Sequence, residues 1–433
     1  MKSNLRIKKF IKKLQTTKFS VGVIGLGYVG LPICARFVKA NIKVYGLDND
    51  KKKINQLKKG ISYIKNNNLK NFNYFKYNKS QVGSDYKILN KCDAILICLP
   101  TPLKNLKPDM SYVFNCSKKI KKILKQYQIL ILESTVYPGA TDKVLEIVKN
   151  KSLEVGKNFF CGYSPERENP GDSSFSYKKT PKVVSGVTKN CELIIQKIYS
   201  PIVKKVVMAK SIKDAELSKL LENMYRAVNI GLVNELKIIC DKLKIDIFNV
   251  IDLASTKNFG FQKFLPGPGL GGHCIPIDPY YLSWISRKNG YEPKFISVAG
   301  KINRSIPKWI VKKMLSKLKS KKLKVLILGV SYKKNIEDDR ESPSFNIMKI
   351  LKSKNIKFEY NDPFFKKLRK SREFNFKKKS IFINKKNLKK FDAVLLVTDH
   401  DFYNYKFIAE NSKIIFDTRG IYKRYNFKNI VYC

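Results

Sequence analysis

The stretch SVGVIGLGYVGLPICARFV, residues 20–38, decides the fold of this chain. It begins with a short apolar run typical of a buried strand, continues through three glycines at GxGxxG spacing, and ends in an apolar stretch with helical character. A second strand-like run, residues 43–47, leads into Asp48. This order predicts a dinucleotide-binding domain, because such domains consist of a strand, a glycine turn, a helix and a second strand that ends in an acid.

Each of these residues has a physical role in such a turn. Gly25 permits the tight turn, Gly27 lets the backbone approach a pyrophosphate, and Gly30 allows helix and strand to pack closely. The helix that follows turns the positive end of its dipole toward the phosphates. Asp48 is expected to accept hydrogen bonds from ribose hydroxyls and to repel a 2′-phosphate, so the sequence predicts NAD as the cofactor.

The rest of the chain extends this pattern. Strand-like apolar runs that alternate with polar or helical stretches lie at residues 94–99, 129–132, 159–163, 183–186 and 205–208. The middle of the chain reads as helix, with a long apolar periodicity at 214–243 and further helix between 279 and 319. Strands return at residues 324–329, 357–360, 393–397 and 413–416.

We therefore expect an α/β protein in which two Rossmann-like, doubly wound parallel-sheet domains are joined by a central long-helix domain. Residues 1–209, with a short basic extension at 1–18, form the predicted NAD-binding domain. Residues 210–319 form the predicted central domain, and residues 320–433 the predicted C-terminal domain. The C-terminal domain lacks GxGxxG after its first strand, so we expect no second dinucleotide there.

Composition and charge narrow the function classes. The formal net charge is +53, but the Lys excess is spread along the whole chain, whereas proteins that read nucleic acid concentrate Arg and Lys on one element. We expect no specific nucleic-acid partner, although a basic nucleic-acid-binding protein remains the alternative from another functional class.

Nine single cysteines without a CxxC pair predict neither a disulfide framework nor a metal site. We find no signal peptide and no run of about 18 apolar residues, which indicates a cytoplasmic protein that does not bind the membrane.

One cysteine differs from the others. Cys274 follows Gly271 and Gly272 and precedes Asp278 by four residues, whereas most other cysteines sit inside apolar runs. A thiol presented on a loop near a nicotinamide cofactor can form a covalent thiohemiacetal, so an alcohol could be carried past the aldehyde to the acid. A one-step dehydrogenase of the β-hydroxyacid type needs no thiol and remains an alternative. His273 is expected to serve packing or substrate binding, outside the catalytic set.

The long central helix carries a polar stripe. Lys219 and Asn223 are four residues apart and therefore share one helix face, which Glu216 and Arg226 extend. The residues around this stripe are apolar, so we expect it to face a protein interior, where polar groups need partners or a task; they are Leu217, Leu220, Leu221, Met224 and Val228. A solvated face of an amphipathic helix is the alternative.

Seven motifs then occur in series: GLGYVGLP (25–32), STVYPG (134–139), YSPERENPGD (163–172), ELSKLLENMYRAVNI (216–230), GGHCIPIDP (271–279), GVSYKKNIEDDRESP (329–343) and DTRG (417–420). Together they make the chain resemble the nucleotide-sugar 6-dehydrogenases, the UDP-glucose and GDP-mannose dehydrogenase family, over nearly its whole length. The resemblance implies a reaction that uses two NAD in succession, in which a sugar C6 alcohol becomes an aldehyde, then a cysteine thioester, and finally the acid.

The resemblance also assigns residues. It implies Cys274 as the nucleophile, Lys219 and Asn223 as stabilisers of the developing oxyanion, and Glu166 as the general acid/base for thioester hydrolysis. Thr135 and Asp278 match residues that position the water, although Asp278 could instead hold its turn. The expected cofactor contacts are Gly25, Gly27, Tyr28, Val29, Gly30, Asp48, Thr101, Ser134, Thr135 and Arg340. The expected substrate contacts are Glu166, Arg167, Lys219, Asn223, Arg226, Gly271, Lys333 and Arg419.

The motif variants also indicate which class of UDP-sugar is the substrate. GGHCIPIDP and SPERENPGD look more like members that oxidise UDP-N-acetylhexosamines than like those that oxidise UDP-glucose, and residues 256–259 lack the Arg that UDP-glucose members place before the glycine turn. We expect UDP-N-acetylglucosamine, with UDP-N-acetylgalactosamine, UDP-N-acetylmannosamine and UDP-glucose as alternatives. The resemblance further implies a homodimer through the central helix and a role in making capsule or O-antigen polysaccharide.

Overall fold

The structure is a computed structural model that describes residues 2–64, 75, 79–167, 180–272, 275–318, 322–369 and 374–433. The chain folds into two compact units. The first unit consists of Met1–Glu222 and Tyr280–Gly290, and the second consists of Asn223–Pro279 and Tyr291–Cys433. The helices of the predicted central domain are divided between these two units, and the division into three domains stays a prediction.

The first unit is built on a parallel sheet, which confirms the predicted fold class. In the described part of the chain this sheet has eight strands in the order β10-β9-β8-β7-β4-β1-β2-β3. Their bounds are β1 Ser20–Ile24, β2 Lys43–Leu47, β3 Gln81–Gly83, β4 Ala94–Ile97, β7 Gln128–Leu132, β8 Phe159–Tyr163, β9 Lys182–Gly186 and β10 Val206–Met208. Neighbouring strands pair in parallel except β8 and β9, which pair antiparallel.

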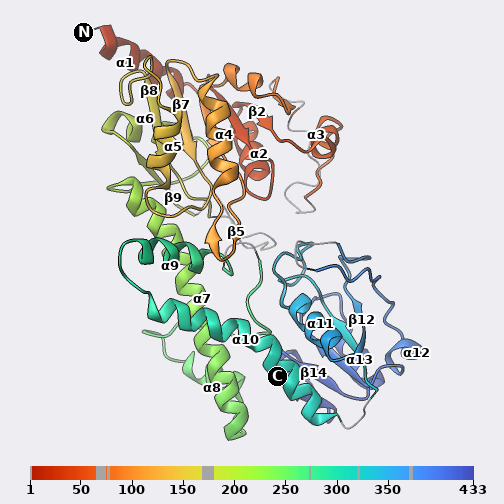
Figure 1. The fold of residues 1–433 in the computed structure, drawn as a ribbon. Coiled ribbons are helices and arrows are strands. Elements are labelled where there is room, and N and C mark those ends of the chain that lie inside the picture. Colours follow the sequence, from red (N-terminus) through yellow and green to blue (C-terminus); the bar gives the residue numbers. More distant parts are fainter. Residues whose placement is uncertain are drawn as a thin grey trace. The chain divides into compact units, whose positions relative to one another are not determined.

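Helices cover both faces of this sheet (Figure 1). One face shares a hydrophobic core with α1 (Lys2–Gln15), α2 (Gly30–Lys39), α3 (Lys51–Lys58) and α6 (Lys189–Tyr199). On the other side, α4 (Ser111–Lys121) packs against α5 (Ala140–Val148). Because successive strand side chains point to opposite faces, β1 gives Val21 and Val23 to the first core, and every residue of this strand is buried.

The strand order reverses beside β1, because β2 lies on one side of it and β4 on the other. In open parallel sheets, ligands bind at such a switch point, outside the carboxyl ends of the strands. A short antiparallel hairpin of β5 (Leu103–Lys104) and β6 (Lys107–Pro108) follows β4 in the chain. Strands of two residues give no sequence periodicity.

The second unit contains a smaller sheet, with the order β12-β11-β13-β14-β15 and parallel pairing throughout. Its strands are β11 Lys324–Leu328, β12 Lys357–Asn361, β13 Ala393–Leu396, β14 Ile415–Asp417 and β15 Ile430–Tyr432. One face shares a core with α10 (Lys294–Lys317) and α11 (Pro343–Ser353). The opposite face packs against α12 (Lys385–Leu388) and α13 (Tyr405–Asn411).

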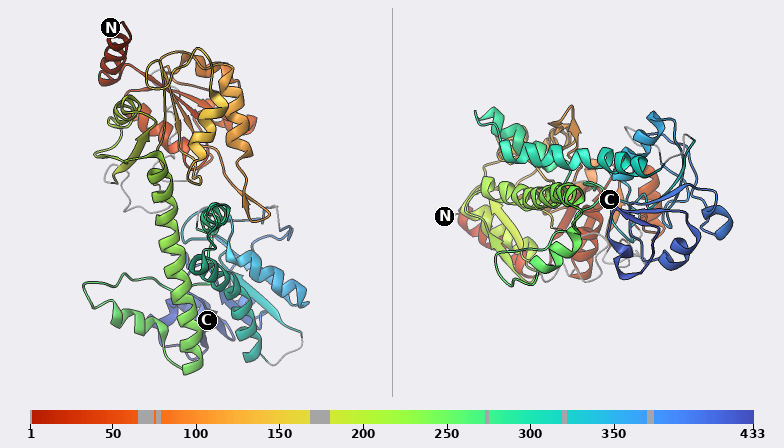
Figure 2. Two further views of the ribbon diagram at one scale, coloured as in Figure 1. Left: turned by 60° about the vertical axis from the view of Figure 1, so that its left-hand side comes forward. Right: turned by 90° about the horizontal axis from the view of Figure 1, so that it is seen from below.

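The remaining helices include the longest element of the chain. Helix α7 runs without a break from Ile212 to Leu243, close to the predicted range (Figure 2). Helix α8 (Ile247–Ala254) begins after Asp246, whose carboxylate accepts hydrogen bonds from the first backbone N–H groups. Helix α9 spans Asp278–Lys288, and the described residues also include short 3₁₀ helices at Tyr86–Lys91 and Ile421–Arg424. The boundary between the two units falls within α7, after Glu222.

Candidate active site

The three glycines after β1 have different surroundings. Gly25 has a φ of +91°, and a Cβ there would lie 2.6 Å from the carbonyl oxygen of Cys98, so the turn requires glycine. A Cβ on Gly30, the first residue of α2, would lie 2.0 Å from the carbonyl oxygen of Gly25. A Cβ on Gly27 would meet nothing within 4 Å. The backbone at Gly27 is therefore open to a ligand, while the other two glycines serve close packing within the protein.

Asp48 stands at the end of β2 and braces this turn. Its carboxylate accepts hydrogen bonds from the backbone N–H of Leu26 and of Asp50, both at 2.9 Å. Lys53 Nζ lies 3.7 Å from the same carboxylate. The side chain of Asp48 is buried, at 9% exposure. An acid at this position thus joins the second strand to the glycine turn, in addition to any role toward a ribose.

The predicted residues after β4 and β7 lie at the same edge of the sheet. The Thr101 hydroxyl donates to the carbonyl of Thr135 at 2.8 Å, and the Ser134 hydroxyl donates to the carbonyl of Leu99 at 2.7 Å. Tyr28 and Val29 are half-buried within the glycine turn. The carboxyl ends of β1, β2, β4 and β7 therefore bring together the cofactor contacts that the sequence predicted in the first unit.

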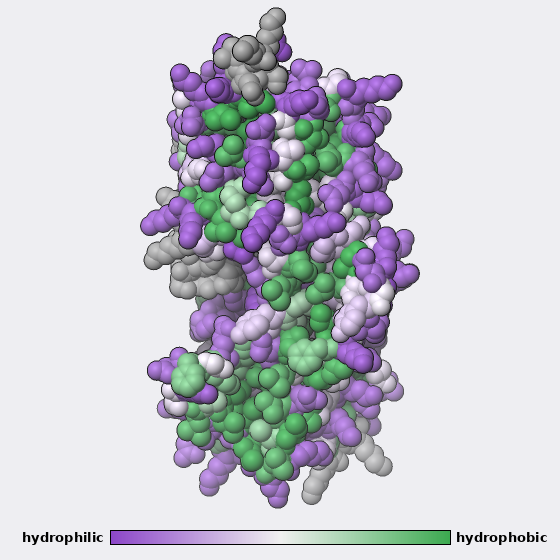
Figure 3. Space-filling model, turned by 90° about the vertical axis from the view of Figure 1, so that its left-hand side faces the viewer, coloured by the Kyte–Doolittle hydropathy of each residue, from purple (hydrophilic) through white to green (hydrophobic). Residues whose placement is uncertain are grey.

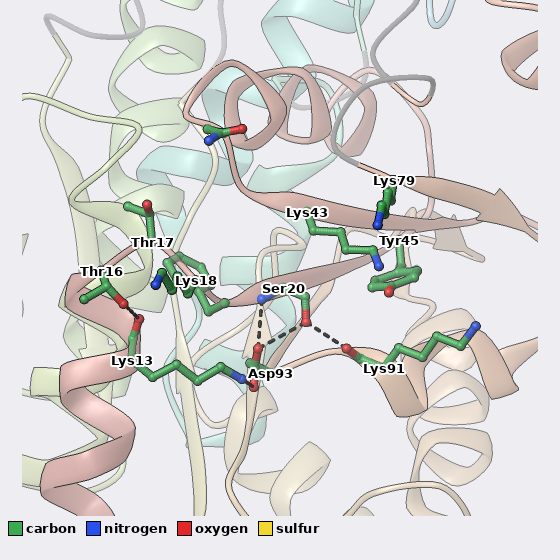
Figure 4. Close-up of a pocket in the computed structure, with 12 residues that line it drawn as sticks. Lys13, Thr16, Thr17, Lys18, Ser20, Lys43, Tyr45, Lys79, Lys91 and Asp93 are labelled. Carbon is green, nitrogen blue, oxygen red and sulfur yellow. Dashed lines mark hydrogen bonds and ion pairs between the residues drawn. The ribbon is translucent and has the colours of Figure 1, made fainter.

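A hollow lined by lysines lies at the opposite end of this sheet. Its lining includes Ser20 and Lys43, the first residues of β1 and β2, and Asp93, which directly precedes β4 (Figure 4). Asp93 accepts hydrogen bonds from the backbone and hydroxyl of Ser20 and pairs with Lys13. These are the amino ends of the strands, so the hollow is separate from the edge that carries the glycine turn.

Helix α7 carries the predicted polar stripe, but its members differ in exposure. Glu216 is fully buried, and its carboxylate accepts hydrogen bonds from the backbone N–H of Gly139 (2.6 Å) and of Thr141 (2.9 Å) at the start of α5. Burial raises the pKa of Glu216, although these hydrogen bonds oppose the shift. Asn223 is 5% exposed, Lys219 is half-buried, and Arg226 is exposed.

The expectation that this stripe faces a protein interior is only partly correct. Leu220 and Met224 are buried, but Leu217 is 42% and Leu221 is 63% exposed. Exposed apolar positions alternate with buried ones around α7, so the helix presents two apolar faces. A single sequence cannot tell which apolar face is covered.

Two predicted catalytic residues meet in the second unit. Asn223 on α7 donates a hydrogen bond to the carboxylate of Asp278, which is 2% exposed and begins α9. These residues are 55 positions apart in the sequence. Cys274 and His273 lie outside the described residues, as does the end of the YSPERENPGD motif from residue 168 onward.

The glycine loop before Cys274 contacts the loop that follows β11. The backbone N–H of Gly272, whose φ is +89°, donates to the carbonyl of Arg340 at 2.9 Å. A Cβ on Gly271 would lie 2.6 Å from the Cβ of Tyr332. The fold therefore brings the predicted substrate contact at Gly271 next to the loop that carries Lys333 and Arg340.

Several charged side chains predicted to contact ligands already have partners within the protein. The Arg340 guanidinium pairs with Asp338, at 2.9 Å from Nε and 2.6 Å from Nη2. Arg167 donates to the carboxylate of Glu222 and to the carbonyl of Pro181. Arg419 Nε donates to the carbonyl of Val397 at 2.8 Å. Burial lowers the pKa of Arg419, and the charges of Asp399 and Asp417 oppose this shift.

Comparison with known proteins agrees with this geometry. The NAD binding domain of the UDP-glucose/GDP-mannose dehydrogenase family matches residues 19–203, its central domain matches residues 213–305, and its UDP binding domain matches residues 326–424. The chain belongs to the UDP-glucose/GDP-mannose dehydrogenase family. This confirms the resemblance that the seven motifs indicated.

Named relatives cover nearly the whole chain. Protein CapL of Staphylococcus aureus is 37% identical over 93% of this chain and 96% of its own length. The UDP-N-acetyl-D-glucosamine 6-dehydrogenase of Pseudomonas aeruginosa is 35% identical over 79% of this chain and 82% of its own. Among solved structures, the UDP-D-ManNAc dehydrogenase of Pyrococcus horikoshii aligns with a TM-score of 0.85 at 27% identity, covering 95% of this chain and 98% of the other.

The cofactor of this dehydrogenase is NAD, which the residues of the first unit fit. The open backbone at Gly27 is where a pyrophosphate can approach, and the N-terminus of α2 lies directly beyond it. Asp48 stands at the end of β2, where ribose hydroxyls are bound in such domains. When bound, NAD supplies the hydride acceptor for oxidation. In the described part of the chain, no helix has both the length and the apolar character needed to cross a membrane.

Sequence reasoning missed the residues that hold the loops in place. In the second unit, Asn234 accepts a hydrogen bond from the backbone N–H of Gly267 (2.9 Å) and donates to Asn303 (3.0 Å). Lys237, one turn further along α7, donates to the carbonyl of Gly267 at 2.9 Å. Burial lowers the pKa of Lys237 to about 7. Two polar residues at helical spacing inside an apolar pattern were the only sequence signal for this network.

A second missed group holds the loop after β11. Asp362 accepts hydrogen bonds from the backbone N–H of Val330 (2.7 Å) and of Ser331 (3.0 Å). His400, which is fully buried, lies 3.1 Å from Asp362 through Nε2, and its Nδ1 accepts a hydrogen bond from the backbone N–H of Asn335. Because Nδ1 accepts, the ring proton belongs on Nε2. His400 had no motif context in the sequence, and only the fold brings it to this loop.

Proposed function

We propose that this chain oxidises the C6 alcohol of a UDP-N-acetylhexosamine to the uronic acid in an NAD-dependent, four-electron reaction. The first two-electron step gives an aldehyde, to which the Cys274 sulfur adds as a thiohemiacetal. The second two-electron step gives a thioester, and water then releases the acid and the thiolate. Such an acid is a suitable precursor for a surface polysaccharide.

The observation that carries the proposal is the hydrogen bond from Asn223 to Asp278. Asp278 lies four residues after Cys274, and Asn223 shares a helix face with Lys219. In our proposal the Lys219 ammonium and the Asn223 amide stabilise the oxyanion that develops at C6. The carboxylate of Asp278 orients the Asn223 amide by accepting one of its two donors, and together with Thr135 it positions the hydrolytic water.

The base for thioester hydrolysis is Glu166 in this proposal. It lies after β8 in the first unit, and its carboxylate is 6% exposed. A general base must be ionised to take a proton from water, so its burial has to be compensated by a nearby cation. Lys182 lies 3.2 Å away and supplies that charge.

The nucleotide is assigned to the second unit. Arg419 and Lys333 are proposed to bind the UDP-sugar, and Arg340 the cofactor. In support, Arg419 Nη1 lies 3.0 Å from where a Cβ on Gly267 would stand, so the arginine borders the glycine loop. The UDP binding domain of the family covers residues 326–424, which include all three cations. Arg226, which is exposed, and Arg167, which pairs with Glu222, are proposed as further substrate contacts.

UDP-N-acetylglucosamine is the proposed sugar nucleotide. A relative from Pseudomonas aeruginosa bears the name UDP-N-acetyl-D-glucosamine 6-dehydrogenase, and relatives from Methanococcus species bear the name UDP-N-acetyl-D-mannosamine dehydrogenase. Both support a UDP-N-acetylhexosamine. The mannosamine and galactosamine epimers and UDP-glucose are the alternatives that an experiment must separate.

Turnover of the purified protein with each of these UDP-sugars tests the proposal. We expect two NADH per sugar consumed, because both oxidations occur before release, and the highest kcat/KM with UDP-N-acetylglucosamine. A one-step dehydrogenase would give one NADH and leave an aldehyde or ketone. Cys274→Ser is expected to form no thioester and to lose acid production. If this variant made acid at the wild-type rate, the covalent mechanism would be wrong.

We also propose a homodimer formed through α7 and α8. On the second-unit part of α7, Leu232, Leu236, Ile239 and Leu243 are spaced four, three and four residues apart and are 36–62% exposed. Leu253 on α8 is 63% exposed. Figure 3 shows hydrophobic side chains gathered over this part of the surface. A continuous apolar stripe of this kind supports contact with a second copy of the chain.

A further inference from the structure

A lysine and two glutamates form a buried cluster in the first unit. Lys182, the first residue of β9, is 1% exposed, and its Nζ lies 2.7 Å from the carboxylate of Glu133 and 3.2 Å from that of Glu166. It also donates to the carbonyl of Pro165 at 3.1 Å. Glu133 is 1% exposed and accepts a further hydrogen bond from the hydroxyl of Tyr199. One ammonium thus serves two carboxylates with almost no access to water.

Such a cluster needs an explanation beyond stability. Removing two carboxylates and an ammonium from water costs several kcal/mol for each ion, and the attraction between them often does no more than offset that cost. A buried ionic cluster is therefore weak evidence for stabilisation. Only one of its members, Glu166, matches a residue to which we assign a proton-transfer role, and Lys182 contacts it directly.

Burial and the surrounding charges shift the pKa values of the two carboxylates in opposite directions. Burial raises the pKa of Glu133, and the charge of Glu166 adds to this shift while Lys182 opposes it. Burial would also raise the pKa of Glu166, but the charges of Lys182 and of Arg36 on α2 outweigh it and hold that pKa below its ordinary value. Among the described residues, Cys98 is a further titratable neighbour beside Tyr199, and burial raises the pKa of its thiol well above the ordinary value, so the thiol stays neutral. Glu166 is thus the member of the pair that takes up a proton last as the pH falls.

We propose that Lys182 is a positioning residue for thioester hydrolysis, which holds Glu166 as an ionised carboxylate in a fixed orientation. This inference rests on the proposed function. In the step concerned, the water oxygen bonds to the thioester carbon, one water proton passes to Glu166, and the carbon–sulfur bond breaks to return the Cys274 thiolate. Lys182 does not touch the reacting atoms. It keeps the proton acceptor unprotonated and in place, while Glu133 supplies the second anion that makes the buried ammonium stable.

Loss of the cation has a defined consequence. In Lys182→Met, burial is no longer balanced, so Glu166 becomes protonated at higher pH than in the wild type. We expect the acid limb of the pH profile of acid formation to move to higher pH. Near neutral pH hydrolysis should slow by roughly 10²-fold, the lower range for losing a general base. Each active site should then release two NADH in a burst and stall as the thioester, visible as added mass on the intact protein.

Matched variants separate this role from a structural one. Lys182→Arg keeps the charge and is expected to restore most of the hydrolysis rate, with the acid limb near its wild-type position. Glu133→Gln keeps the contact between Lys182 and Glu166, so its acid limb should not rise. Lys182→Met could fail to fold because it leaves the carboxylates of both Glu133 and Glu166 without their cation. The double variant Lys182→Met, Glu133→Gln then removes the Glu133 carboxylate. It is expected to show the same upward shift of the acid limb and the same trapped thioester.

The outcomes are distinguishable. If the Lys182 variants form acid with the wild-type pH profile and without a trapped adduct, while Glu166→Gln does accumulate the thioester, the inference fails and the proposed function stands. If the wild type releases one NADH per sugar and Glu166→Gln traps nothing, the proposed function itself fails.

Discussion

Replacing Asp362 by Asn is expected to destabilise the second unit, because this side chain is the main acceptor at the start of the loop after β11. Asp362 is 3% exposed, and one of its oxygens accepts from the backbone N–H of Val330 at 2.7 Å and of Ser331 at 3.0 Å. The other oxygen accepts from Phe364 at 2.8 Å and from Phe365 at 3.2 Å. An amide has one acceptor oxygen, so either orientation leaves one pair of backbone donors facing an NH2 group.

The size of the effect follows from these contacts. A hydrogen bond to a charged group contributes about 1.5 kcal/mol at the lower end of its range, so losing two should lower the free energy of unfolding by about 3 kcal/mol. For a unit of this size that corresponds to a fall in melting temperature of roughly 6 to 12 °C. The loop also carries Lys333, so the affinity for UDP, measured by calorimetry, should fall as well.

The same contacts predict a pH dependence. Burial would raise the pKa of Asp362, but its hydrogen bonds with His400 and with the backbone donors lower it below the ordinary value. A carboxyl with a lowered pKa in the folded state stabilises the fold above its unfolded pKa of about 3.9 and loses this contribution as the pH falls further. The difference in melting temperature between wild type and D362N should therefore shrink in acid.

Scanning calorimetry on both proteins, at neutral pH and near pH 3, is the appropriate measurement. Asp252→Asn is the matched control: Asp252 pairs with Lys263 on the surface of the same unit and its side chain is 63% exposed, so its removal should cost only about 0.5 kcal/mol. If D362N melted no lower than D252N at neutral pH and bound UDP as tightly as the wild type, the assignment of Asp362 as the anchor of this loop would be refuted.

Three further predictions concern the glycine turn, a buried lysine and the apolar face of α7. Gly30→Ala should lower the melting temperature and abolish NAD binding, because its Cβ would lie 2.0 Å from a carbonyl oxygen. Gly27→Ala should melt like the wild type and lose only NAD affinity, because a Cβ there would meet nothing within 4 Å. Equal effects of the two variants on melting temperature and NAD affinity would contradict this. Burial lowers the pKa of Lys237 to about 7, so above this pH the unfolded chain binds the lysine proton more tightly than the folded chain. The wild type should therefore gain stability relative to Lys237→Met as the pH rises from about 7 to 9. If the melting temperatures of the two proteins changed in parallel over this range, a neutral buried lysine would be excluded. Leu236→Glu should convert the proposed dimer to a monomer in analytical ultracentrifugation, and an unchanged sedimentation coefficient would place the interface elsewhere.

Local sequence patterns were sufficient for much of the fold. The predicted strand at residues 159–163 matches β8, and the helix expected at 214–243 matches α7 to within two residues. Such elements are readable because burial of a strand or a helix face imposes a period on consecutive residues. The antiparallel pairing of β8 with β9 could not be predicted, since strand direction depends on the path of the chain between strands. The strands β3 and β15 were not predicted either, whereas β10 and β14, which are equally short, were.

The residues of the candidate site could be predicted from the sequence only where they belong to a motif. Gly25, Gly27, Gly30 and Asp48 are close in sequence, and their spacing alone brought them to one turn. Lys182 could not be identified, because one lysine among 87 basic residues carries no signal until the fold buries it between two carboxylates. The expectation that the polar stripe of α7 faces a protein interior was only partly correct for the same reason, since periodicity gives the faces of a helix but not what covers them, and Leu217 and Leu221 are exposed.

By itself, the sequence determined most of the strands, the long central helix, the dinucleotide turn, the cofactor and the family, because each depends on residues that are neighbours along the chain or on motifs that recur in a fixed order. The tertiary structure alone decided which ionisable groups share a buried environment: Lys182 with Glu133 and Glu166, and His400 with Asp362. The physical reason is that hydrogen bonding and the cost of removing charge from water depend on distance and burial in space, and residues far apart in the sequence acquire both only when the chain folds.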